Sequence, residues 1–126
     1  MKKSRLFILA LLVTAFIVGC ASAPPFQFSP GVYTGVGNGW AGPIHVMVEV
    51  DNSRIISVTI GQNLETQSIA AAAFYRIPRQ IVERQSLDVD TMTGVTLTVD
   101  GIVEAVKVAL ISAGATEEQL MARGRR

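Results

Sequence analysis

The chain has 126 residues, a length that suits one domain. Hydrophobic residues make up 49% of it, and part of this share lies in one N-terminal segment. Basic and acidic residues nearly balance, at 11 and 10, so the charge indicates no nucleic-acid partner. One cysteine, one histidine and scattered carboxylates argue against a clustered metal site and against a hydrolase of the serine or cysteine type.

The N-terminal segment has the pattern of a secretion signal. Residues 1–5 are basic, and residues 6–18 form an uncharged apolar run. This run is shorter than the roughly 20 residues that a membrane-spanning helix needs. It ends in Ile17-Val18-Gly19-Cys20, which resembles the lipobox of bacterial lipoproteins, where cleavage precedes a cysteine that takes a lipid. We therefore expect residues 1–19 to be a lipoprotein signal peptide and Cys20 to be the lipidation site.

Lipidation also explains why an exported chain has a single cysteine, although a small core cysteine is the alternative. Residues 20–30 hold three prolines and are predicted to form a lipidated tether between the membrane and the folded domain. Two or three acyl chains give durable membrane attachment. We therefore expect the protein to be extracytoplasmic and anchored through Cys20 to the lipid of the inner or the outer membrane.

Alternating apolar and polar residues predict strands in the first half of the domain. The first strand is expected over residues 32–37, and a glycine-rich turn follows it. Apolar residues then recur at every second position over residues 44–50 and again over residues 56–60. A short polar turn joins these two segments, which predicts a β-hairpin.

Helical patterns dominate the second half. Residues 66–75 are rich in alanine, and Pro78 can start a second helix that ends near Gln85. Residues 87–95 are mixed and are compatible with a brief strand. An apolar stripe predicts the clearest helix over residues 99–113.

Strands that precede helices favour an α+β fold. We expect a small antiparallel sheet, made of the N-terminal strands and the hairpin, packed by two to three helices. The domain is expected to span residues 31–115, and residues 116–126 are expected to form a C-terminal tail with at most a frayed helical turn.

A segment rich in hydroxyl groups, residues 90–98, stands directly before the clearest helix. Backbone N–H groups at a helix start, together with threonine hydroxyls, can hold a phosphate group. Gly94 allows the backbone to turn and to approach a ligand closely. The alternative is that Thr96 or Thr98 only caps the helix.

The same segment carries a family resemblance. Asp90-x-x-Thr93-Gly94-Val95-Thr96 resembles the flavinylation motif Asp-x-x-(Ser/Thr)-Gly-Ala-(Ser/Thr) of FMN-binding domains, which occur in sodium-pumping NADH:quinone reductase and in Rnf electron-transport complexes. Similar features extend over most of residues 31–110, including Glu65-Thr66 and the segment 80–90 that precedes the motif. In that family a flavin transferase that uses FAD joins FMN through a phosphoester to the last residue of the motif. Position by position, this acceptor is Thr96.

The resemblance also implies which residues surround the FMN. Next to the Thr96 phosphate we expect Thr93, Gly94, Val95 and Thr98. Asp90 belongs to the transferase motif and is expected to orient Thr93. The flavin ring is expected to lie against Glu65, Thr66, Ile69 and Trp40, although Trp40 serves equally well as a cap on the sheet. The chain departs from the family where Val95 replaces the usual alanine and where Gln67-Ser68 replaces Pro-Gly.

Together these features predict an FMN-binding, extracytoplasmic electron-transfer lipoprotein rather than an enzyme, because the chain is short and has no room for a separate catalytic domain. Its expected partners are the flavin transferase, a membrane oxidoreductase or quinone-linked complex, and the lipid membrane. The alternative is a non-catalytic lipoprotein that binds flavin non-covalently or serves as an accessory subunit of a membrane redox complex.

Overall fold

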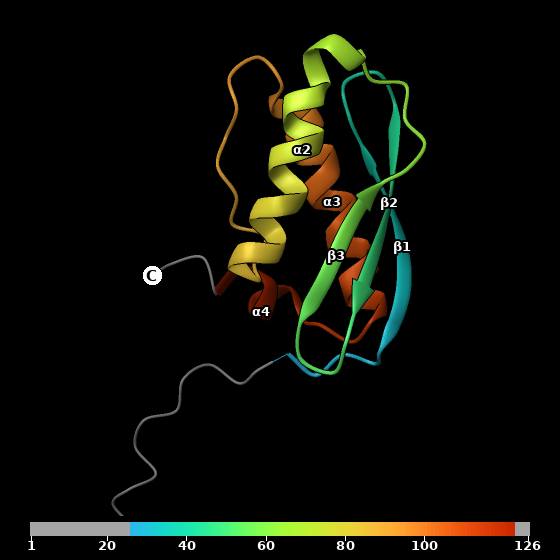
Figure 1. Cartoon of the computed structure of the whole chain (residues 1–126), viewed down its shortest axis with the longest axis vertical. Coiled ribbons are helices and arrows are strands. Elements are labelled where there is room, and N and C mark those ends of the chain that lie inside the picture. Colours follow the sequence, from blue (N-terminus) through green and yellow to red (C-terminus); the bar gives the residue numbers. More distant parts are fainter. Residues whose placement is uncertain (1–25, 123–126) are drawn as a thin grey trace, which may run out of the picture.

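The computed structural model describes residues 26–122, and this part of the chain has an α+β fold (Figure 1). Three strands come first: β1 (Gly31–Asn38), β2 (Pro43–Val50) and β3 (Ile55–Ile60). Three helices follow: α2 (Gln67–Arg84), α3 (Thr96–Ser112) and α4 (Glu117–Ala122). This arrangement confirms the predicted fold class. The expected signal peptide and Cys20 lie outside the described residues.

The strands form an antiparallel sheet in the order β1-β2-β3, so the predicted hairpin is the β2–β3 pair. Alternate residues of β2 are buried, from Ile44 to Val50, and the residues between them face solvent. Figure 1 shows α2 and α3 together on one side of this sheet. The buried side chains of β2 therefore form the floor of a core that these two helices cover.

Helix α3 lies on β1 with its backbone in direct contact with the strand backbone. A Cβ atom added at Gly35 would collide with the Ala105 carbonyl oxygen, and one added at Gly37 would collide with the Gly101 carbonyl oxygen. Gly101 makes the corresponding close contact from the helix side, because a Cβ atom there would lie 2.8 Å from the Asn38 carbonyl carbon. Only glycine fits at this contact, which fixes the position of α3 along β1.

Helix α2 is continuous, although its sequence suggests two helices separated at Pro78. A proline inside a helix lacks the N–H group that would bond to the preceding turn. Here Ile77, Pro78 and Ile81 are all buried. Their burial against the core continues α2 through Pro78 and offsets the lost hydrogen bond.

Residues 87–95 are not a strand but a loop that returns along α2. Side chains bind its backbone N–H groups in place of a neighbouring strand. The Asp88 N–H donates to Ser86 Oγ at 3.0 Å, and the Asp90 N–H donates to Gln80 Oε1 at 2.9 Å. The loop therefore ends at the start of α3 with a path determined by side-chain contacts.

The folded part begins earlier than the sequence suggests. Phe26 and Phe28 belong to the core, and their rings stack with centroids 4.8 Å apart. Such a pair is too apolar to remain in a solvated tether. At the other end, α4 buries Leu120 completely, and the Leu120 carbonyl accepts hydrogen bonds from Leu87 N–H and Ser86 Oγ. Residues 26–30 and α4 are thus integral to the domain.

No helix within residues 26–122 is long and apolar enough to cross a membrane.

The contact between α3 and β1 leads to a stability prediction. We expect Gly37→Ala to lower the free energy of unfolding by about 1–3 kcal/mol or more, because the added methyl group must displace the backbone of α3. Thr34→Ala is the matched control, since Thr34 lies on the exposed face of the same strand. Urea unfolding measures both variants. Equal stability of Gly37→Ala and the wild type would contradict the close backbone contact.

Candidate functional site

A cavity of about 450 Å³ opens where the β1–β2 turn, the start of α2 and the start of α3 meet. This volume lies within the range of about 300–1,000 Å³ that is typical of ligand pockets. The residues that line it are Trp40, Glu65, Thr66, Ile69, Ala70, Gly94, Val95, Thr96, Leu97 and Thr98.

The structure brings most of the predicted site residues together around this cavity. Thr93 and Asp90 are the exceptions, and they lie on the loop before α3 rather than in the cavity wall. Sequence reasoning missed Ala70 and Leu97. Each follows a predicted residue directly in the chain, so only the helix geometry shows that both neighbours face the cavity.

Glu65 joins the three elements that enclose the cavity. Its side chain is buried, with a residue exposure of 7%. Oε1 accepts a hydrogen bond from the Ala41 N–H at 2.9 Å, and Oε2 accepts one from the Thr98 hydroxyl at 2.7 Å. Both bonds to this acceptor are charge-assisted when the carboxylate is ionised, which makes them short and strong. Glu65 therefore holds the β1–β2 turn against the first turn of α3.

The segment before Glu65 is positioned in the same way. Asn63 Oδ1 accepts the Glu65 N–H at 3.2 Å, and Asn63 Nδ2 donates to the Gly61 carbonyl at 3.1 Å. Thr66 is the N-cap residue of α2, and its carbonyl accepts the Ala70 N–H at 2.8 Å. The loop between β3 and α2 is thus bonded internally where it carries Glu65.

The N-terminus of α3 faces the cavity without a side-chain cap. Val95 is the N-cap residue and has no side-chain oxygen, while Thr96 is the first residue of the helix and has an exposed side chain. The expected alternative, a cap by Thr96 or Thr98, is not what the structure contains, since Thr98 donates to Glu65. Free N–H groups and the positive end of a helix dipole favour an anion at this position.

Gly94 forms the backbone turn that leads into α3. Its φ of +86° lies in the left-handed region, which side chains other than glycine rarely adopt. The Val95 N–H closes a turn to the Met92 carbonyl at 3.3 Å. A Cβ at Gly94 would meet no atom within 4 Å, so the backbone conformation and not space requires glycine here.

Asp90 is bonded to α2 rather than to Thr93, which it was expected to orient. One guanidinium nitrogen of Arg84 lies 3.1 Å from each carboxylate oxygen of Asp90. Gln80 Nε2 donates to Oδ2 at 3.1 Å. Asp90 therefore holds the loop on α2 at a distance from the cavity.

Among the residues that line the cavity, Glu65 alone has a charged side chain. Residues 32–48, 55–75 and 91–99 contain a single charged side chain, that of Glu65. The exposed side chains in these segments include large apolar ones, Trp40, Ile69 and Leu97, which line the cavity. Within the described residues, no group of His, Cys, Asp and Glu is arranged to hold a metal ion.

These properties fit FMN. The apolar side chains around the cavity offer a surface for a planar ring system. The hydroxyl of Thr96 and the uncapped start of α3 offer a place for its phosphate. Glu65 and Thr98 bond to each other, so they leave no unpaired buried polar atom against the ring.

The bridge formed by Glu65 leads to a second prediction. Glu65→Ala leaves the Ala41 N–H and the Thr98 hydroxyl without their partner, so we expect a loss of about 1–3 kcal/mol in the free energy of unfolding. Fluorescence anisotropy of Trp40, the only tryptophan, should fall because the adjoining turn loosens. Glu104→Ala is the control: Glu104 accepts the Asn38 N–H at 2.9 Å but is exposed, so water can replace it. Unchanged anisotropy in Glu65→Ala would count against the bridge.

Comparisons with known proteins identify the family. Residues 39–111, more than half of the chain, match the FMN-binding domain. The chain is 32% identical over 101 residues to the NADH:acrylate oxidoreductase of Vibrio harveyi, which covers 80% of this chain and 10% of that protein. It is 30% identical over 86 residues to an uncharacterized protein of Treponema pallidum (strain Nichols), which covers 68% of this chain and 24% of that protein. The chain therefore spans a small part of these relatives. It belongs to the FMN-binding domain family, and FMN is its cofactor.

Proposed function

We propose that this protein carries its FMN covalently, through a phosphoester to Thr96, and works as an electron-transfer module outside the cytoplasmic membrane. The observation that carries this proposal is the position of Thr96. Its exposed hydroxyl group stands at the uncapped, positive end of α3 and at the wall of the cavity. A phosphate attached there lies at the helix N-terminus, where negative charge is stabilised.

The attachment exchanges the phosphoanhydride bond of FAD for a phosphoester bond and involves no oxidation. The Thr96 oxygen bonds to the phosphorus of the FMN half of FAD, the pyrophosphate bond breaks, and AMP leaves. The hydroxyl proton passes to a base of the flavin transferase, which is the second protein that the reaction requires. The exposed side chain of Thr96 is compatible with access by such an enzyme.

FMN supplies the redox chemistry, whereas the protein sets position and local polarity. In this proposal Trp40, Ile69 and Leu97 contact the ring, because they are the large apolar residues of the cavity wall. Glu65 keeps the Trp40 turn and α3 at a fixed separation. The residues act by binding and orienting, which suits a carrier that gives and receives electrons at one site.

The relatives support a module within a redox chain. The chain corresponds to about a tenth of the NADH:acrylate oxidoreductase, so it matches one part of a larger flavoprotein. We therefore infer that it passes electrons between partners. A membrane oxidoreductase or quinone-linked complex is the proposed electron donor or acceptor.

The fold also supports a membrane-anchored orientation. Ser29 donates its N–H to the Ala113 carbonyl at 2.9 Å, so the N-terminal segment enters the domain next to the end of α3. The cavity lies at the start of the same helix, whose 17 residues span about 25 Å. A lipid on Cys20 would therefore leave the FMN at the end of the domain that faces away from the anchored segment.

Intact mass tests the covalent attachment. We expect the protein, after co-expression with a flavin transferase and denaturation, to gain the mass of one FMN less one water, because a phosphoester survives unfolding. Thr96→Ala should gain nothing. Thr91→Ala is the matched control and should be modified normally, since Thr91 is also exposed but stands at a variable position of the motif and lies outside the cavity wall.

Two outcomes would change the proposal. An unmodified wild type, with the transferase active on another substrate, would leave FMN bound non-covalently at the start of α3. Modification of Thr96→Ala would overturn Thr96 as the acceptor and move the attachment to another hydroxyl group of the loop.

A further inference from the structure

Asp90 is the first residue of the flavinylation motif, yet its side chain points to α2 and not to the acceptor. Gln80 binds it twice, by donating from Nε2 to Oδ2 at 3.1 Å and by accepting the Asp90 N–H on Oε1 at 2.9 Å. Arg84 binds both carboxylate oxygens at 3.1 Å. The carboxylate is thus occupied by its own domain, and these contacts determine where the loop leaves α2.

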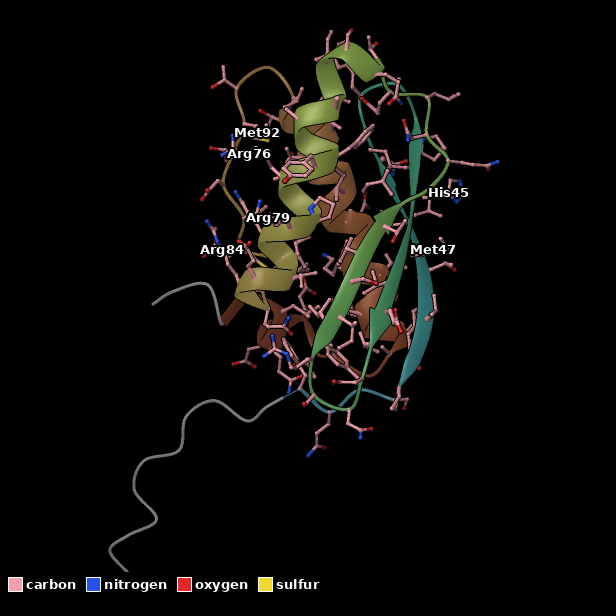
Figure 2. All side chains as sticks on the ribbon, viewed as in Figure 1. His45, Met47, Arg76, Arg79, Arg84 and Met92 are labelled. Atoms are coloured by element: carbon pink, nitrogen blue, oxygen red, sulfur yellow. The ribbon has the colours of Figure 1, made fainter. Side chains whose placement is uncertain are left out.

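Arg84 also binds the loop two residues before Asp90. A second guanidinium nitrogen donates to the Asp88 carbonyl at 3.0 Å. Gln80 and Arg84 are four residues apart on α2, so they lie one above the other on the same face of the helix. Figure 2 shows Arg84 and, farther along the same side of α2, Met92 of the loop. The loop therefore runs along this face between Asp88 and Met92.

The loop segment between Asp90 and Thr96 makes few hydrogen bonds. The Val95 N–H bonds to Met92 across the turn, and Gly94 has the unrestricted backbone of glycine. Met92 packs only partly against the core. Val95, directly before Thr96, is buried in the core. The bonds of Asp90 with α2 are consequently the last side-chain hydrogen bonds of the loop before Thr96, and the segment between them flanks the hydroxyl group that must be modified.

We propose that Gln80 and Arg84 are positioning residues for flavinylation, which hold Asp90 so that the loop presents the Thr96 hydroxyl to the flavin transferase. This inference rests on the proposed covalent attachment. It assigns Asp90 a role through α2, in place of direct recognition by the transferase. The rate of FMN transfer to Thr96 then depends on Gln80 and Arg84, two residues that lie outside the motif.

The ion pair suits this role better than a role in stability. The side chains of Arg84 and Asp90 are 39% and 55% exposed, and pairs in such positions contribute little to the free energy of unfolding. Loss of the pair should therefore leave the domain folded while the loop gains freedom. Misplacement of a reacting group by even a small distance lowers the rate of a positioned reaction strongly.

The experiment is a double-mutant cycle on the rate of FMN transfer, with the full-length protein, a purified flavin transferase and FAD. Arg84→Ala and Asp90→Ala should each lower kcat/KM by about tenfold or more, mainly through kcat. The double variant should be no slower than Asp90→Ala alone, because each single substitution already removes the same contact between Arg84 and Asp90. Gln80→Ala should give a smaller loss, and Arg84→Lys should restore part of the rate by keeping a donor in place.

Arg79→Ala is the matched control. Arg79 lies on the same helix, and its Nε is 2.7 Å from Glu83 Oε1, so the substitution also removes an exposed ion pair. The hydrogen bond to Glu83 raises the pKa of the Arg79 guanidinium. The transfer rate of Arg79→Ala should equal that of the wild type. Thermal unfolding of every variant reports whether the fold is retained.

A wild-type rate for Arg84→Ala beside a slow Asp90→Ala would overturn the proposal, because the transferase would then read Asp90 directly. Independent losses that add in the double variant would overturn it as well. Equal FMN-transfer rates for all variants would also overturn it, because Asp90 would then have no role in presenting Thr96. If the wild type accepts no FMN from an active transferase, the proposed covalent attachment itself is wrong. This outcome differs from those that contradict only the positioning role of Gln80 and Arg84.

Discussion

The direct contact between the backbones of α3 and β1 is the constraint on which the site depends. Gly35 and Gly37 on the strand, with Gly101 on the helix, allow the two backbones to touch. The approach leaves no room for a side chain, so the helix cannot slide along the strand without a collision. As a result, the start of α3 stands beside the turn that follows β1. Thr96 and Trp40 come from distant parts of the sequence and line one cavity for this reason.

Glu65 adds a side-chain link to that backbone contact. A buried carboxylate is costly unless hydrogen bonds satisfy it. Here the partners are the Ala41 N–H and the Thr98 hydroxyl, one from each side of the cavity. The bonds are possible only because α3 already stands next to the turn. Glu65 is the one carboxylate residue of the cavity wall, and both of its oxygens are paired, so it stabilises the wall without an unpaired oxygen.

Much of this architecture follows from local patterns in the sequence. Period-two alternation over residues 44–50 predicts β2, and the motif at Thr96 indicates the site. The errors share one cause, which is that tertiary packing overrides a local signal. Pro78 predicts a helix start, but burial of its neighbours continues α2 through it. Phe26 stands in a segment with several prolines, and only the folded core shows where its ring is buried. The side-chain bonds that shape residues 87–95 likewise join positions that no periodicity relates.

The same limit explains why a motif alone does not reveal the role of its own first residue. Six positions separate Asp90 from Thr96, and in an extended chain the two would act as parts of one linear signal. In the folded domain they belong to different surroundings: Thr96 begins α3, and Asp90 is held on the last two turns of α2. The loop between them spans the two helices. A linear motif can therefore combine the acceptor of the proposed attachment with a residue that anchors the loop, and the two are distinguished by the residues that each one contacts.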